Sequence, residues 1–182
     1  THQARLQVIN DGTTTNENRL GAIRDIELGL AKTACDEDTL IIAGDNLFDF
    51  DLNAFLAFAR SHADGVSIAL YDVKDVKAAS NYGVVKIDVS FRVVDFQEKP
   101  AVPPSTLAST GIYFFPKNKL PFIKEYVTMQ SKLDAPGYYI GWLAGRDKVY
   151  GYTFTDRWYD IGSIESYTKA DKEYQEKERK HG

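Results

Sequence analysis

The chain has 182 residues, 43% of them apolar and 26% charged, a balance that fits a single globular domain over residues 1–182 and argues against a disordered chain. Its formal net charge of −4 argues against nucleic-acid binding, because a protein that binds the phosphate backbone must present a basic surface. No apolar run is long enough to span a bilayer, and the single cysteine, Cys35, allows no internal disulfide, so we expect a cytoplasmic protein without membrane contacts.

The first third of the chain alternates between strand and helix patterns. Residues 5–9 predict a short strand, and from Leu20 onward the apolar residues fall on one helical face. The apolar run 39–43 predicts a strand buried on both faces, and Asp51 is placed to cap a following helix. Residues 65–71 are again typical of a strand. This alternation predicts an α/β fold with a mostly parallel sheet.

The rest of the chain predicts further strands and three helices. The expected strands are 83–88, 92–97, 108–115 and 149–155, the first two forming a hairpin. Helices are expected over 119–129 and 138–143, and Ser163 is placed to cap a final helix. In that helix Glu173 lies four residues before a lysine, which is typical of a solvated face.

The most specific local feature is Gly44-Asp45-Asn46, directly after the strand predicted over 39–43. Ligands of open α/β sheets bind at the carboxyl ends of strands. A carboxylate there suits Mg²⁺, which takes hard oxygen ligands together with waters and substrate phosphates. The alternative is that Asp45 only caps a turn or the next helix, and the motif alone supports both interpretations equally.

A second feature, Glu98-Lys99-Pro100, ends a predicted strand. Pro100 stops the strand and favours an extended conformation at Lys99. Glu98 and Lys99 are then expected to point to opposite faces, one holding a hydroxyl and the other a phosphate. Taken alone, an ordinary surface pair flanking a turn is the better interpretation.

A third feature is the segment 158–163, in which Asp160 precedes a Gly-Ser helix start. Helix N-termini attract anions, and a nearby carboxylate would bring a cation to them; alternatively, Asp160 is simply an acid at the start of a helix. Two weaker signals are Tyr82-Gly83 and Thr110-Gly111. Each glycine allows a ligand to approach the backbone closely, or only relieves packing.

Together and in this order, these segments resemble the sugar-1-phosphate nucleotidyltransferases that make nucleotide sugars. The matching segments are Gly44-Asp45-Asn46, Tyr82-Gly83-Val84-Val85, Glu98-Lys99-Pro100, Thr110-Gly111-Ile112-Tyr113 and Trp158-Tyr159-Asp160-Ile161-Gly162. Each is short, but five in register over residues 39–170 make a strong signal. The resemblance implies a Rossmann-like fold of three layers around a mostly parallel mixed sheet.

The resemblance also implies residue roles. Asp45 and Asp160 would converge on one cleft and hold a catalytic Mg²⁺, and Lys99 would contact the sugar phosphate as the third catalytic residue. The implied substrate contacts are Asn46, Gly83, Glu98, Lys99, Thr110 and Gly111. An oxygen of the sugar-1-phosphate would attack the α-phosphorus of a nucleoside triphosphate and release pyrophosphate, a reaction that depends on positioning and charge neutralisation.

The chain departs from this family in several segments. The family opens with a strand and a loop of the form Gly-x-Gly-x-Arg-Leu, followed by Lys-Pro, and neither motif precedes Gly44-Asp45-Asn46 in this chain. We therefore expect that an N-terminal strand–loop–helix portion of roughly 60 residues is missing, and that the 182-residue chain is inactive alone. Residues 16–22 differ from a Gly-rich turn that contacts the base in many relatives. Residues 133–137 replace a Glu-containing segment of thymidylyltransferases, so neither base nor sugar is identified.

Two other classes remain open. One is a non-catalytic module that keeps a sugar-nucleotide pocket, and the other is a cytidylyltransferase acting on phosphocholine. Glu98 and Thr110 favour a polyol because hydroxyls need polar partners, whereas choline favours an aromatic cage, for which Tyr138 and Tyr139 are available. The expected partners are a nucleoside triphosphate and a sugar-1-phosphate, and the sequence leaves a homo-oligomer open.

Overall fold

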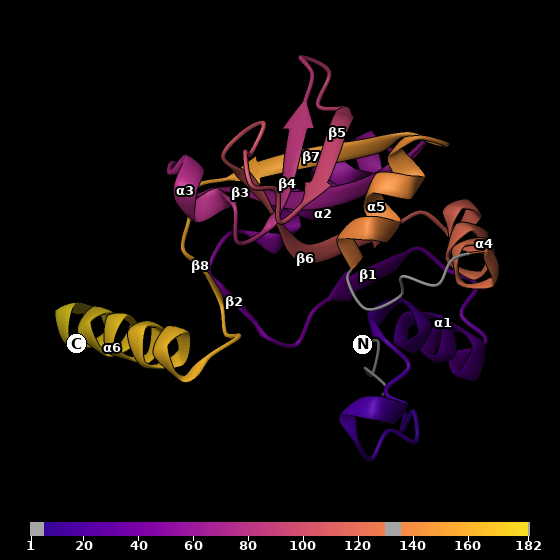
Figure 1. The fold of residues 1–182 in the computed structure, drawn as a ribbon, viewed down its shortest axis with the longest axis horizontal. Helices are drawn as coiled ribbons and strands as arrows, with labels where there is room; N and C mark the ends of the chain where they lie inside the picture. Colours follow the sequence, from indigo (N-terminus) through magenta and orange to yellow (C-terminus); the bar gives the residue numbers. More distant parts are fainter. Residues whose placement is uncertain (1–5, 130–135, 182) are drawn as a thin grey trace.

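A computed structural model describes residues 6–129 and 136–181 of the chain (Figure 1). The strands are β1 (Thr39–Ile42), β2 (Asn46–Phe48), β3 (Val66–Asp72), β4 (Gly83–Ile87), β5 (Val93–Glu98), β6 (Leu107–Phe115), β7 (Val149–Phe154) and β8 (Trp158–Asp160). The α-helices are α1 (Ala22–Thr33), α2 (Leu52–Ser61), α3 (Val76–Ala79), α4 (Pro121–Met129), α5 (Pro136–Ala144) and α6 (Ile164–His181). Short 3₁₀ turns occupy 16–18 and 117–119.

The main sheet is mixed and mostly antiparallel, so the expected mostly parallel sheet is wrong. Its six strands follow the order β5-β4-β6-β3-β7, with β1 also paired to β6. β6 runs antiparallel to β1, β3 and β4, and only β3 and β7 pair in parallel within the described part of the chain. β1, β3 and β7 do share one direction, as the strand–helix alternation predicts. The error arises because β6 inserts between β1 and β3 in the opposite direction.

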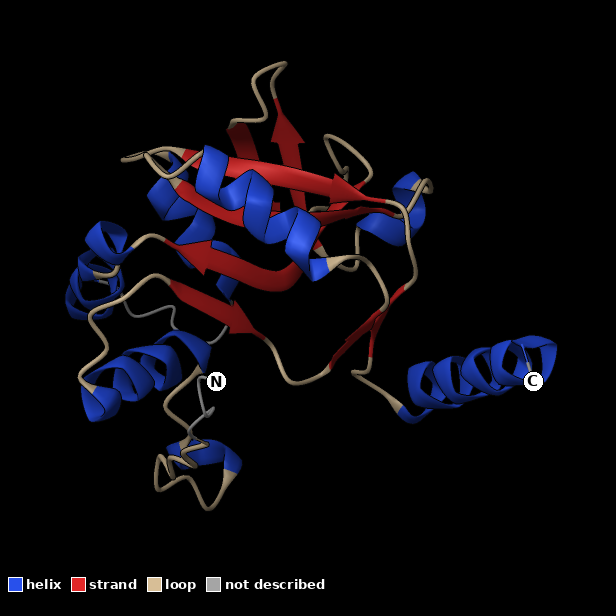
Figure 2. Cartoon of the chain, turned by 180° about the vertical axis from the view of Figure 1, so that it is seen from behind, coloured by secondary structure: helices blue, strands red, loops and turns tan. Residues whose placement is uncertain are grey.

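Two apolar cores lie on the two faces of this sheet and give the fold three layers. On one face, side chains of β3 and β6 pack against α1, α4 and α5; this core includes Ile23, Phe115, Ile123 and Ile140. On the opposite face α2 covers the sheet, as Figure 2 shows, and its Phe55 is fully buried. Successive residues of a strand point to opposite faces, which is how β6 supplies both cores.

Several local predictions are confirmed. Asp51 caps α2, because its side chain accepts a hydrogen bond from the N–H of Asn53 at 2.8 Å. The Oγ of Ser163 accepts from the N–H of Ser166 at 3.1 Å, at the start of α6. The predicted helices and strands between residues 20 and 155 are all present with shifts of a few residues at their ends.

Other local predictions are wrong. The described residues of the segment 5–9 form no strand, and Leu6 and Val8 are exposed. β1 is not buried on both faces: it pairs with β6 alone among the described strands, and Ile42 is 42% exposed. Glu173 does not lie on a purely solvated face, because it accepts a hydrogen bond from the hydroxyl of Tyr159. Of residues 133–137, the first three lie outside the described residues.

A short two-stranded ribbon extends from the main sheet and carries the C-terminal helix. β2 pairs antiparallel with β8, and Figures 1 and 2 both show α6 at the far end of this ribbon, away from the main sheet. Asp49 and Arg157 form an ion pair of 2.6 Å beside the ribbon. Among the described helices, none has the length and apolar character needed to cross a membrane.

Candidate active site

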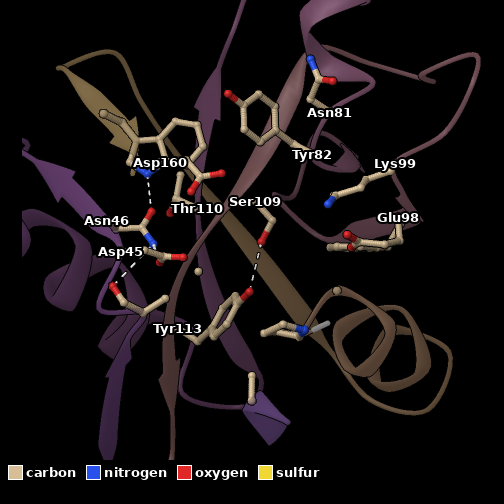
Figure 3. A pocket seen from close by; sticks show the side chains of 18 residues that line it. Asp45, Asn46, Asn81, Tyr82, Glu98, Lys99, Ser109, Thr110, Tyr113 and Asp160 are labelled. Carbon is tan, nitrogen blue, oxygen red and sulfur yellow. Dashed lines mark hydrogen bonds between the residues drawn. The ribbon is translucent and has the colours of Figure 1, made fainter. Parts of the chain in front are cut away.

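The β2–β8 ribbon brings together two acids that are far apart in the sequence. Asn46 pairs with Asp160 across the ribbon, and the N–H of Ile161 donates to the carbonyl of Asp45 at 2.8 Å. Asp45 and Asp160 both line a cavity of about 360 Å³, with Lys99 on its lining as well (Figure 3). The expected convergence of the two acids on one cleft is therefore present in the structure.

Every predicted site residue lines this cavity. These residues are Asp45, Asn46, Gly83, Glu98, Lys99, Thr110, Gly111 and Asp160. They come from the carboxyl end of β1, the β4–β5 hairpin, the middle of β6 and the end of β8. Figure 3 shows Asp45 and Asp160 on one side of the cavity, with Glu98 and Lys99 reaching towards it from the other.

The electrostatics of the site favour a bound cation near the two acids. Burial raises the pKa of the Asp160 carboxyl above its usual range, and the neighbouring carboxylate of Asp45 raises it further, while Lys99 opposes both effects. Two close carboxylates with open space before them suit Mg²⁺, which completes its shell with water and phosphate oxygens. The described residues contain no group of three or more His, Cys, Asp or Glu side chains that would form an all-protein metal cage.

Lys99 has a backbone conformation that the sequence did not predict. Its φ is +46°, in the left-handed region that a non-glycine residue seldom adopts, so the expected extended conformation is wrong. The N–H of Lys99 donates to the carbonyl of Tyr82 at 3.0 Å, which anchors this turn to the segment before β4. As a result Glu98 and Lys99 line the same cavity instead of pointing to opposite faces.

The Glu98 carboxylate lies in a narrow space between two glycines. A Cβ at Gly83 would lie 3.0 Å from Glu98 Oε2, and a Cβ at Gly137 would lie only 2.0 Å from the same oxygen. Burial raises the pKa of the Glu98 carboxyl, and Lys99 opposes that effect. The site therefore holds a partly desolvated acid against bare backbone, an arrangement suited to accepting hydrogen bonds from hydroxyl groups.

Thr110 and Gly111 shape the floor of the cavity in the middle of β6. The buried Thr110 hydroxyl donates to the carbonyl of Ala69 at 3.0 Å, so its proton is used within the sheet. Gly111 has a φ of +72°, which disfavours any larger residue. Its carbonyl accepts from the N–H of Ala43 at 3.0 Å, and this bond fixes the start of the Gly44-Asp45-Asn46 segment.

The cavity also has lining residues that the sequence reasoning missed. They include Asn81, Phe96, Ser109 and Gly137. Tyr82, Tyr113 and Trp158 also line it; they lie in the matching segments but were given no role. Burial raises the pKa of Tyr113 to about 12, so the phenol is neutral near pH 7, and Ser109 lies 3.5 Å from its hydroxyl. The alternation of residues 109, 111 and 113 along one strand face was a usable signal. Tyr138 and Tyr139, the expected aromatic pair for choline, do not line the cavity.

Comparisons with known proteins identify the family and the fold of this chain. A family model described as "Nucleotidyl transferase" matches residues 3–177. A solved structure described as a glucose-1-phosphate thymidylyltransferase from Bacillus anthracis, with sucrose bound, has a TM-score of 0.69 and 21% identity over 82% of this chain and 59% of its own. Apo UDP-glucose pyrophosphorylase has a TM-score of 0.76 and 22% identity over 88% of this chain and 62% of its own.

A UDP-glucose pyrophosphorylase solved with UDP-glucose gives a TM-score of 0.72 and 23% identity, over 86% of this chain and 62% of its own. The chain thus spans about 60% of the length of these solved structures, and at such identities the likeness concerns the fold. The family match covers almost the whole chain, and its residues include every one that lines the cavity. The chain therefore belongs to the nucleotidyl transferase family.

Proposed function

We propose that this site transfers a nucleotidyl group from a nucleoside triphosphate to a sugar-1-phosphate and releases pyrophosphate. The observation that supports this most directly is the convergence of Asp45, Asp160 and Lys99 on one cavity. Two acids and one base around an open space match a reaction in which several phosphate charges must be positioned and neutralised. A neighbouring fold is that of a pyrophosphorylase solved with UDP-glucose.

In this proposal each side chain has one task. Asp45 and Asp160 hold Mg²⁺, which when bound neutralises phosphate charge. The Lys99 ammonium binds the phosphate of the sugar-1-phosphate and keeps it in line for attack. Glu98 accepts hydrogen bonds from sugar hydroxyls, and the backbone at Gly83 lies close enough to the sugar to select its shape.

The test of this proposal isolates the charge of Lys99. Lys99→Met keeps most of the side chain's length but removes its charge. In the natural polypeptide that contains this domain, the variant should lower the rate of pyrophosphate release by roughly 10²–10³-fold, the usual effect of losing one preorganised charge-stabilising group. Lys86→Met, an exposed lysine on β4 outside the cavity, is the matched control. Near-full activity of Lys99→Met with every sugar-1-phosphate tested would refute the phosphate role.

A second candidate, a cytidylyltransferase that acts on phosphocholine, is favoured by one observation. Tyr82, Phe96, Tyr113 and Trp158 all line the cavity beside Glu98, and aromatic faces with a nearby carboxylate attract quaternary ammonium groups. Competition between glucose 1-phosphate and phosphocholine for the 182-residue chain separates the two. Tyr82→Leu should weaken phosphocholine more than glucose 1-phosphate if choline is the substrate, and Glu98→Gln should weaken the sugar more if it is not.

A further inference from the structure

The side chain of Asn46 connects a buried indole to the exposed acid Asp45. The Nε1–H of Trp158 donates to Asn46 Oδ1 at 2.5 Å, and Asn46 Nδ2 donates to Asp45 Oδ1 at 2.9 Å. Figure 3 marks both bonds by dashed lines. The two hydrogen bonds link Trp158 in strand β8, through Asn46, to the acid that follows β1.

The chemistry of the three groups fixes the orientation of the amide. An indole N–H is only a donor, an ionised carboxylate is only an acceptor, and an amide presents one group of each kind. The amide oxygen must therefore face Trp158, and the amide nitrogen must face Asp45. Aspartate at position 46 would place two carboxylates side by side, and alanine would leave the indole N–H without its acceptor.

The Trp158 indole is the rigid end of this hydrogen-bonded link. Trp158 is 9% exposed, and its ring packs against Tyr71 and Tyr82 at centroid distances of 5.6 and 5.3 Å. Asp45, in contrast, is exposed, and an exposed carboxylate on a turn samples several rotamers unless a hydrogen bond holds it. Groups that orient a metal-binding carboxylate by a hydrogen bond strengthen metal binding.

We propose that Asn46 and Trp158 are positioning residues that hold the Asp45 carboxylate in the orientation required for a divalent cation. This inference rests on the proposed function, in which Asp45 binds the metal. It assigns Asn46 a positioning role beside the substrate contact that the family resemblance implies, because its amide oxygen and its amide nitrogen each make a hydrogen bond within the protein. The indole thereby serves the metal side of the site through its hydrogen bond to Asn46.

The chain offers a direct spectroscopic test, because it has two tryptophans. A nitrogen–proton correlation spectrum should show one indole signal for each. Trp142→Phe identifies them and is the matched control, because the Nε1 of Trp142 is buried without a partner in the described part of the protein. Asn46→Ala should move the Trp158 signal upfield and leave the Trp142 signal in place. An unmoved Trp158 signal would overturn the inference.

Metal binding is measured with Mn²⁺ alone, by paramagnetic broadening of the Trp158 signal and by the concentration of free Mn²⁺. Asn46→Ala and Trp158→Phe should each weaken Mn²⁺ binding by about 10–100-fold, the usual effect of removing an outer-shell partner, and Trp142→Phe should not. If Asp45→Asn loses Mn²⁺ while Trp158→Phe binds as tightly as the wild type, the positioning role is overturned and the proposed function stands. If the wild type binds no Mn²⁺ beside Trp158, the proposed function fails and the inference fails with it.

Discussion

The contact between Gly137 and Glu98 gives a prediction that uses two glycines of one helix. In α5, a Cβ at Gly137 would lie 2.0 Å from Glu98 Oε2 and 2.8 Å from the Phe96 ring, whereas a Cβ at Gly141 would meet Phe96 at 3.7 Å, an ordinary contact. Gly141→Ala should therefore stabilise the fold by about 0.8–1.0 kcal/mol, the difference in helix propensity. Gly137→Ala should destabilise it by about 1–3 kcal/mol, as overpacking does.

The effect of Gly137→Ala on sugar binding follows from the distance between the added Cβ and Glu98 Oε2. A Cβ contact below 3.0 Å forces some atom to shift, and the end of a flexible side chain yields most easily. We therefore expect Glu98 Oε2 to move by about the difference between 3.0 and 2.0 Å, which is 1.0 Å. A displaced carboxylate no longer accepts from the sugar, and one hydrogen bond to a charged group contributes about 1.5–3 kcal/mol. Gly137→Ala should then bind glucose 1-phosphate roughly 10–150-fold more weakly, and Gly141→Ala should bind it as the wild type does.

Urea denaturation measures the free energy of unfolding of each variant, and calorimetric titration with glucose 1-phosphate and Mg²⁺ measures its affinity for the sugar phosphate. The carboxyl resonance of Glu98 gives an independent reading, because burial raises its pKa in the wild type, and displacement into solvent should return that pKa towards 4.5. Equal stability changes in the two alanine variants, together with an unchanged pKa of Glu98 in Gly137→Ala, would show that Gly137 does not position the carboxylate.

A further prediction concerns the effect of Asp160 on stability. Because burial and Asp45 raise the folded-state pKa of Asp160 above 3.8, its ionisation opposes folding. Asp160→Asn should therefore raise the melting temperature at pH 7 by about 2–4 °C for each kcal/mol relieved, and the gain should vanish as the pH falls below 3.8; a gain of equal size at pH 3 contradicts this.

Short motifs predicted which residues line one cavity better than they predicted the direction of the strands. Asp45, Lys99 and Asp160 each end a strand-like run and line one cavity, but not because strand ends gather at one edge of a parallel sheet. β5 runs opposite to β1, and β8 belongs to the separate ribbon. The direction of β6 was not predictable from periodicity, since an apolar run has no direction until it pairs. The ribbon of β2 and β8 was missed because each strand has three residues, too few for an alternation to be recognised.

Contacts between residues far apart in the sequence also could not be predicted from local sequence patterns. The left-handed backbone at Lys99 depends on its hydrogen bond to Tyr82, and local propensity favours the opposite conformation. Gly137 contacts Glu98 only because α5 packs on β5. The link from Trp158 through Asn46 joins residues 112 positions apart, and each residue alone resembles an ordinary core or turn position.

The position of β1 at the border of the main sheet has a consequence for handling the protein in solution. Among the described strands β1 pairs with β6 alone, so no described strand uses the amide and carbonyl groups on its other edge. The side chain of Ile42 at the end of this strand is 42% exposed. An unpaired strand edge can form backbone hydrogen bonds with an extended segment of another chain that has alternating apolar residues. Concentrated samples of residues 1–182 should consequently form oligomers in which the edge of β1 pairs with an extended segment of another molecule. A short extended peptide added in excess should compete for this edge and keep the protein in solution.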